Sequence, residues 1–310
     1  MAEKAGVKTE GTSSAVFPVT VVIATRNRCQ QLVRLLDRHT APVIVVDNGS
    51  QDGTAEMVES RFPHVRVIRL RENAGAAARN IGVAAAETPY VAFADDDSYW
   101  ESDALASAAR LLAAHPRAAL LTGRVLAGED GRLDAVSRQM AAAPLGVPRD
   151  LPGPSVLGFL ACAAVVRRDA FLAVGGFEPK LHMYGEEALL AMDLASAGWG
   201  LAYVPSLVVR HFPESTGRDP GARRRREARN ALLTAWTRRP LSVGARAALR
   251  SLASRDSRGG LLDALTELPW VRRHRRPVAA RVEAALRALA CAPPPHLAPA
   301  PDVSLAVSER

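Results

Sequence analysis

Three consecutive aspartates, Asp95, Asp96 and Asp97, directly follow a short apolar run. A buried strand that ends in a cluster of negative charge is costly unless a cation binds there. Carboxylate oxygens are ligands that a divalent metal prefers, and such a metal can bridge to a substrate phosphate. Capping of a helix expected near 101–115, by Asp97 or Ser98, is the alternative. Three carboxylates together favour a metal and phosphate site over a cap.

A second acidic pair, Glu186 and Glu187, lies far along the chain. A carboxylate within hydrogen-bond reach of a substrate hydroxyl can act as a general base. The pair also opens an expected helix over 186–197, where negative charge is favourable in the first turn whatever the function. His211 follows an expected short strand at 207–209. It could complete a metal site or be structural, and the residues alone leave both open.

Both acidic groups need a scaffold, and the first hundred residues predict a parallel α/β sheet. Continuous apolar, β-branched runs are expected of strands buried on both faces, and they alternate here with apolar residues at helical spacing. We expect strands at 19–24, 43–46, 65–70 and 90–94, and helices at 30–39, 54–61 and 75–86.

Right-handed crossovers place the carboxyl ends of such strands on one edge of the sheet, where ligands bind in open α/β folds. The loop 25–28, the segment 47–50, Asn73 and the three aspartates are therefore expected along that edge. Asp47 could bind a nucleotide base or ribose there, or serve a turn in a segment rich in turn formers. The Gly-rich dinucleotide fingerprint and the phosphate loop are both absent, which disfavours a nicotinamide-binding fold and a P-loop NTPase.

The second half of the chain is less regular. A Gly- and Pro-rich connection over 127–154 is expected to be a mobile flap with a weak helix. The remaining expected elements are strands at 118–125, within 154–166, at 201–204 and at 207–209, a short helix at 168–174 and a loop at 177–185. Residues 217–290 read as basic helices, with a net charge of +12, and 291–310 as a Pro-rich disordered tail.

Composition bounds the class of protein. The 310 residues, 48% of them hydrophobic, suffice for one sizeable domain with an extension, or for two small domains. Three widely spaced cysteines favour a reducing compartment. No signal peptide or membrane-spanning run is recognisable, so a cytoplasmic chain is expected. The net charge of +8 is carried almost entirely by arginine, which indicates compositional bias more than a nucleic-acid partner.

Five segments together resemble family 2 glycosyltransferases of the GT-A fold. They are VTVVIATRNR (19–28), VIVVDNGSQDGT (43–54), RENAGAAARNIG (71–82), YVAFADDDSYWESDAL (90–105) and the stretch 175–211. The resemblance implies an α/β, Rossmann-like and mostly parallel central sheet flanked by helices, with a C-terminal α-helical extension. The expected organisation is a leader at 1–16, a catalytic domain at 17–216 with halves 17–125 and 126–216, the extension at 217–290 and the tail at 291–310.

The resemblance further implies transfer of a sugar, with inversion, from a nucleoside diphosphate donor, UDP or dTDP being favoured. Asp95 to Asp97 fill the place of the family's DxD element, with Asp97 as the direct ligand of Mn²⁺ or Mg²⁺. Asp95 or Asp96 would face the ribose, and Asp95 and His211 are further candidate metal ligands. The remaining candidates for the nucleotide-sugar site are Thr25, Arg28, Asp47, Asn48 and Arg79.

By the same resemblance Glu187 aligns with the general base, and Glu186 precedes it. The family's Asp is a Glu here, which lengthens the arm by one methylene. A non-catalytic nucleotide-sugar-binding or scaffold protein on the same fold is the alternative. Tyr184 is a candidate for the acceptor pocket. Trp100 could stack on the acceptor or pack in the core.

Potential partners follow from the resemblance and from the basic extension. The acceptor could be a glycan, a lipid-linked sugar or a small molecule. Arg223 to Arg226 with Arg229 could bind an anionic lipid or an acceptor phosphate at the inner face of a membrane, or could form a solvated helix surface. Two chains could also pair as a homodimer. A nucleic-acid partner is not expected, because aromatic residues are sparse among the arginines.

Overall fold

The computed structural model describes residues 18–142, 144–213 and 219–292. The predicted leader and most of the predicted Pro-rich tail lie outside these residues. Within them the chain forms one mixed sheet of nine strands, ordered β3-β2-β1-β4-β8-β6-β9-β5, with β7 beside β6. The strands are β1 Val19–Thr25, β2 Val43–Asp47, β3 Arg66–Arg69, β4 Tyr90–Ala94, β5 Ser98–Trp100, β6 Ala118–Ala127, β7 Arg132–Leu133, β8 Ala164–Arg167 and β9 Gly200–His211.

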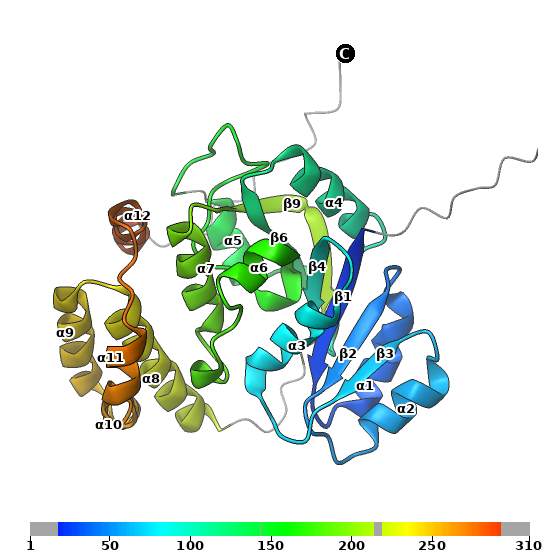
Figure 1. The fold of residues 1–310 in the computed structure, drawn as a ribbon, viewed down its shortest axis with the longest axis horizontal. Helices are drawn as coiled ribbons and strands as arrows, with labels where there is room; N and C mark the ends of the chain where they lie inside the picture. Colours follow the sequence, from blue (N-terminus) through cyan, green and yellow to red (C-terminus); the bar gives the residue numbers. More distant parts are fainter. Residues whose placement is uncertain (1–17, 143, 214–218, 293–310) are drawn as a thin grey trace, which may run out of the picture.

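The predicted parallel half of the sheet is confirmed. Strands β1 to β4 pair in parallel, and β6 pairs in parallel with β9, whereas β8, β5 and β7 run against their neighbours. Helices connect the parallel strands (Figure 1). The carboxyl ends of β1, β2 and β4 therefore meet at one edge, and each of these ends carries residues predicted for the site.

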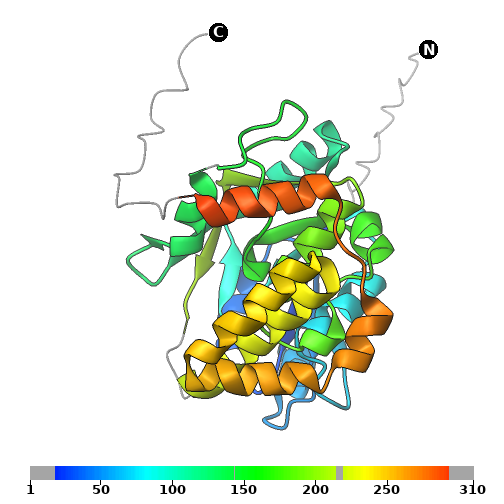
Figure 2. The ribbon, with the colours of Figure 1, turned by 90° about the vertical axis from the view of Figure 1, so that its left-hand side faces the viewer.

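Twelve α-helices accompany the sheet in the described residues: α1 Cys29–Leu35, α2 Thr54–Arg61, α3 Ala78–Ala85, α4 Ala104–Ala114, α5 Ala135–Ala141, α6 Arg168–Ala173, α7 Glu186–Ser196, α8 Pro220–Arg238, α9 Leu241–Arg250, α10 Arg255–Leu265, α11 Leu268–His274 and α12 Ala280–Cys291. The last five form the expected C-terminal helical extension. They gather on one side of the molecule, the side that Figure 2 turns toward the reader. No helix in the described part of the chain is both long and apolar enough to cross a bilayer.

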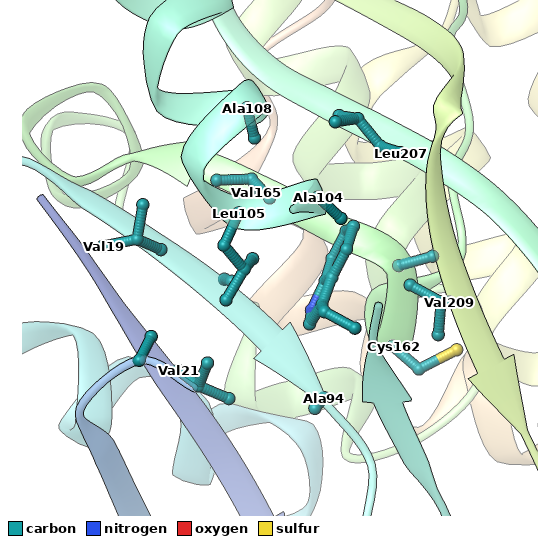
Figure 3. Packing of buried hydrophobic residues seen from close by; sticks show 14 of the residues in the cluster. Val19, Val21, Ala94, Ala104, Leu105, Ala108, Cys162, Val165, Leu207 and Val209 are labelled. Atoms are coloured by element: carbon teal, nitrogen blue, oxygen red, sulfur yellow. The ribbon is translucent and has the colours of Figure 1, made fainter. Parts of the chain in front are cut away.

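Two apolar layers enclose the sheet, because successive side chains of a strand face opposite sides. Val21 and Ile23 face one layer, and Val22 between them faces the other. Figure 3 shows the first layer, where Leu105 of α4 packs toward Val19. Complete burial of such a side chain stabilises the fold by about 1.5–3 kcal/mol. These layers hold the strand ends of the site in place.

Several predicted elements differ from the structure. The two short strands expected at 201–204 and 207–209 are one strand, β9, whose register with β6 shifts near Pro205. β5 has no counterpart among the predicted elements. Helix α4 begins after Asp103, so the suggested capping role of Asp97 or Ser98 is wrong. The apolar stretch 154–166 carries only a bridge and a 3-10 turn before β8 begins at Ala164.

The extension shares a hydrophobic core with residues of the domain at 17–216. Leu181 and Leu189 pack against Leu232 and Leu233 of α8, together with Ala264 and Val271. Much of its basic charge is paired, as in Arg224 with Asp256 and Arg225 with Asp263. The extension therefore packs against the segment that carries the glutamate pair. Both the extension and this segment hold the site in place.

Candidate active site

A cavity of about 760 Å³ lies at the expected edge of the sheet, and we call it the edge cavity. It is lined by residues from both halves of the catalytic domain and by α8. Most of the predicted site residues lie in its wall, namely Thr25, Arg28, Asn48, Arg79, Asp95, Asp96, Asp97, Tyr184, Glu186, Glu187 and His211.

Asp95, Asp97 and His211 each offer one ligand atom, and these atoms lie within 4.8 Å of one another. The antiparallel pairing of β5 with β9 sets Ser98 opposite His211, which brings the histidine to the aspartates from a distant part of the chain. His211 Nε2 lies 3.2 Å from Asp97 Oδ1. Carboxylate oxygens suit a Mn²⁺ or Mg²⁺ ion, and of the two Mn²⁺ better accepts an imidazole nitrogen, so the residues present fit the implied metal.

The aspartates also explain the protonation of His211. Burial lowers its pKa, but the hydrogen bond with Asp97 and the charges of Asp97 and Asp95 outweigh this, so the pKa is raised overall. The imidazole accordingly holds its proton to a higher pH than a free histidine does. A metal ion must displace that proton before it can bind to the ring nitrogen.

We expect His211→Ala to weaken Mn²⁺ binding by about tenfold or more, because one ligand is lost while both carboxylates remain. The affinity for Mn²⁺ is measured by calorimetry, in a titration with Mn²⁺ at a fixed nucleotide concentration. His64→Ala removes an exposed histidine outside the cavity wall and serves as the control. Equal Mn²⁺ affinity in the wild type and in His211→Ala would show that His211 is not a ligand.

Asp96 is held apart from the metal cluster. Thr25 Oγ1 donates a hydrogen bond to its Oδ2 at 2.8 Å, and Arg28 Nε lies 3.8 Å from its Oδ1. Burial raises the pKa of Asp96 to about 6 even though the Thr25 hydrogen bond lowers it. The last residue of β1 and the loop after it thus orient this carboxylate on the side of the cavity formed by the first two strands.

Arg79 supplies positive charge behind the carboxylates. Its guanidinium Nη2 lies 2.5 Å from Asp95 Oδ1. Burial lowers its pKa, but the charge of Asp95, helped by those of Glu186 and Glu187, raises it overall. Arg79 Nε is a buried donor with no protein partner in the described part of the chain. Arg79 as a whole lies in the cavity wall and places positive charge there.

The glutamate pair opens α7 and lines the edge cavity together with the aspartates. Burial, followed by the charge of Glu186, raises the pKa of Glu187 to about 7. Burial also raises the pKa of Glu186, which is only 5% exposed. Its Oε2 has no protein partner among the described residues. A carboxylate whose pKa lies near neutrality is suited to accept a proton at the pH of a cell.

A strained loop delivers these glutamates. His182, Tyr184 and Gly185 all have positive φ, at 60°, 74° and 89°. Such a conformation is costly for a non-glycine residue and persists only where the surroundings hold it. Asn230 of α8, which is fully buried, donates hydrogen bonds from Nδ2 to the carbonyls of Leu181, Met183 and Tyr184 at 2.8 to 2.9 Å.

We expect Asn230→Ala to lower the free energy of unfolding by about 1–3 kcal/mol and to reduce kcat, because buried carbonyls lose their donor and the loop is released. Calorimetric unfolding and steady-state rates measure the two effects. Asn230→Asp keeps the size but lacks the amide donors, so it should behave similarly. Gln139→Ala, at an exposed amide, is the control. We call the hydrogen bonds from Asn230 to this loop the Asn230 clamp. Unchanged stability in Asn230→Ala would contradict its stabilising role.

Two predicted residues do not line the edge cavity. Asp47 is 5% exposed, and its Oδ1 accepts a hydrogen bond from the Ser50 backbone, as the turn interpretation expects; its contact with the donor base stays a prediction. Trp100 is 2% exposed and donates from Nε1 to the Phe93 carbonyl. It is a core residue, so the suggested acceptor stacking is corrected.

Asn48 has a structural role as well as a place in the wall. Its Oδ1 accepts from the Ala74 backbone, and its Nδ2 donates to the Gly75 carbonyl. The sequence reasoning missed other wall residues, among them Asp134, Met183 and Glu227. No local pattern marks these residues, because they reach the cavity only through long-range packing.

Comparison with known families places this geometry in context. A family model described as glycosyl transferase family 2 matches residues 20–175. The chain is 31% identical over 214 residues to N-acetylglucosaminyl-diphospho-decaprenol L-rhamnosyltransferase of Mycobacterium tuberculosis, a match that covers 58% of this chain and 69% of the relative. It is 34% identical over 221 residues to the pre-mycofactocin glycosyltransferase of the same organism, covering 66% of this chain and 45% of that protein.

Solved structures share the fold. A mannosyltransferase from Pyrobaculum calidifontis, in complex with GDP-Man and Mn²⁺, superposes with a TM-score of 0.54 at 21% identity, covering 88% of this chain and 86% of that one. TarS 1-349 of S. aureus, in complex with UDP-GlcNAc, gives a TM-score of 0.54 at 18% identity, covering 86% and 83%.

Proposed function

Because this chain belongs to glycosyltransferase family 2, we propose that it transfers a sugar from a nucleoside diphosphate donor to an acceptor hydroxyl, with inversion at the anomeric carbon. One observation carries the proposal. The metal-ligand cluster of Asp95, Asp97 and His211 and the glutamate pair at the start of α7 line the same cavity.

The donor would lie along the ends of β1, β2 and β4. The charge of Arg79 in the cavity wall would attract the diphosphate, and Thr25 and Arg28 hold Asp96 for a donor hydroxyl. Asp95, Asp97 and His211 would hold Mn²⁺ or Mg²⁺, which supplies positive charge to the departing diphosphate. UDP or dTDP is the proposed nucleotide.

The acceptor would lie on the side of the glutamates. An inverting transfer needs a base that takes the proton of the acceptor hydroxyl as the new glycosidic bond forms. Glu187 is the proposed base, because its raised pKa leaves it able to bind a proton near pH 7. Glu186 and Arg79 set the charge around it. Tyr184 at the cavity wall is the proposed acceptor contact.

A nucleotide panel tests the proposal. UDP, dTDP, GDP and CDP are each added with and without Mn²⁺, and the thermal unfolding midpoint is followed. One nucleotide should raise the midpoint in a metal-dependent manner, since a ligand that binds only the folded state stabilises it. Slow release of free sugar from the matching nucleotide-sugar should accompany binding.

Binding without any hydrolysis or transfer would instead support the non-catalytic alternative. No metal-dependent binding of any nucleotide would contradict the proposal. Pairing of two chains, and membrane contact through the basic helices, stay predictions.

A further inference from the structure

A second cavity, also of about 760 Å³, lies between α7, α8, α9 and α12, and we call it the helical groove. Its size falls within the range of about 300–1,000 Å³ that is usual for small-molecule sites. Figure 2 shows α8 and α9 side by side, with α12 lying across their upper end. The extension and α7 therefore enclose a cavity that is large enough for a small molecule.

The helical groove adjoins the edge cavity. Tyr184, Gly185 and Glu227 line both spaces. Arg223 lies over the Tyr184 ring, with its Cζ 5.0 Å from the centroid, and pairs with Glu227 at 2.7 Å. A molecule that occupied both spaces would therefore pass Tyr184, with its hydroxyl on the side of Glu187.

The floor of the groove is mainly apolar. Small and aliphatic side chains from all four helices form it, namely Ala188, Met192, Ala231, Ala235, Val243, Ala247 and Ala290. One polar atom interrupts this floor. Thr234 is only 7% exposed, and its Oγ1 has no hydrogen-bond partner among the described residues. This hydroxyl is a buried polar group within an otherwise apolar floor.

The rim of the groove is strongly basic. Four arginines line it, and two of them, Arg239 and Arg287, share Glu283. Arg246 and Arg250 are exposed on α9 and form no ion pair within residues 18–142, 144–213 and 219–292. An apolar floor below unpaired arginines matches a ligand that is apolar and anionic at once.

The position of Arg250 orients such a ligand. Trp236 Nε1 of α8 donates to the Gly244 carbonyl of α9 at 3.2 Å, so the two helices pack as a hairpin about Pro240. The end of α9 returns along α8 toward Glu227, which lines the junction with the edge cavity. A phosphate held by Arg246 and Arg250 would therefore lie nearer to the junction than an apolar chain directed toward α12.

We propose that the helical groove binds the phosphate and the adjoining apolar chain of a lipid-linked acceptor. The lipid chain lies over the alanine-rich floor, its phosphate lies between Arg246 and Arg250, and its sugar passes Tyr184 to reach Glu187. The role as acceptor rests on the proposed transferase function, whereas the binding of an apolar phosphate does not. The extension thereby selects the acceptor class.

The test uses farnesyl diphosphate with the full chain, titrated by calorimetry in the presence of EDTA so that the metal cluster takes no part. We expect saturable one-to-one binding in the wild type, and binding of inorganic diphosphate at least tenfold weaker. The double variant Arg246→Ala/Arg250→Ala should raise the Kd at least tenfold. Ala231→Trp, at an exposed position on the floor, should do the same by filling the groove.

Matched controls lie outside the groove. Arg258→Ala removes an exposed arginine of α10, and Ala245→Trp adds an indole at an exposed position of α9 that does not line the groove; both should keep the wild-type Kd. Cys291 lines the groove and is exposed, so farnesyl diphosphate should slow its alkylation, with Cys29 as an internal reference.

Absent or groove-independent binding of farnesyl diphosphate would overturn the proposal. So would a homodimer that Ala231→Trp dissociates in a chain that binds no farnesyl diphosphate, because the groove would then be an interface between copies. The groove variants should keep metal-dependent nucleotide binding. If the wild type bound farnesyl diphosphate but no nucleotide, the transferase proposal would fail while lipid-phosphate binding in the groove stood.

Discussion

Asp97→Asn is expected to lower the transfer rate by about 10³-fold or more, because the metal site loses the charge of one carboxylate. Asp97 lies within reach of both other candidate metal ligands, and its side chain is 13% exposed. An amide keeps the shape and removes the charge, so the fold should persist. Both the metal-dependent thermal shift with nucleotide and the turnover should be lost.

Asp103→Asn is the matched control for this variant. Asp103 precedes α4, is exposed, and makes no side-chain capping bond. Its replacement should leave nucleotide binding and turnover unchanged. If Asp97→Asn retained the wild-type rate at saturating Mn²⁺, Asp97 would not be a metal ligand and the proposed chemistry at this edge would be wrong.

Glu187→Gln is expected to lower kcat by about 10²- to 10⁴-fold while nucleotide binding persists, because a glutamine cannot accept the acceptor's proton. The variant should fold at least as well as the wild type. Burial raises the pKa of Glu187 to about 7, which means that the folded state disfavours its charge. Removing that charge above pH 7 relieves a cost, so the thermal midpoint should stay equal or rise.

The pH dependence of kcat/KM gives an independent test of the role of Glu187. The base works only when deprotonated, so kcat/KM should fall about tenfold per pH unit below its pKa and reach a plateau above it. With the pKa raised to about 7, the fall begins near neutrality instead of near 4.5, the ordinary pKa of a free glutamate. Glu187→Gln should remove this limb from the residual activity.

Two further variants sharpen the assignment of Glu187. Glu187→Asp shortens the arm by one methylene and should retain part of the rate, whereas Glu87→Gln, at an exposed glutamate, should have none of these effects. A Glu187→Gln variant with wild-type kcat would assign the base elsewhere, and Glu186 would be the next candidate.

The sequence could predict those parts of the fold that depend on residues close together along the chain. Strands β1, β2 and β4 were predictable because their apolar runs are continuous and the intervening helices are local. β3 carries arginine at both ends and was predictable from its place in the alternation of strands and helices. The prediction split β9 at Pro205, which lacks a backbone donor. The sheet instead absorbs Pro205 in a register shift against β6. Pairing with a partner strand, which no local pattern reports, overrides the propensity.

The site divides in the same way. Asp95 and Asp97 stand out because three carboxylates follow a buried strand. His211 was a candidate ligand from the sequence, but its approach to the aspartates depends on β5, a strand of three residues that is too short to predict. The suggestion that Trp100 stacks on the acceptor rested on its closeness to the carboxylates in the sequence. Its place on β5 turns the indole into the core, where it bonds to Phe93. Asn230 had no sequence signal, because its role exists only once α8 packs against the loop.

The Asn230 clamp also bears on how this chain can be recombined. The family model ends at residue 175, whereas the clamped loop, the glutamate pair and α8 all lie beyond it. A chimera that exchanges residues 176–213 alone would part the loop from the helix that holds it. One that carries 176–238 as a single block keeps the clamp intact. Residues 176–213 and α8 are therefore one structural unit, and an exchange that keeps the loop in place has to carry both.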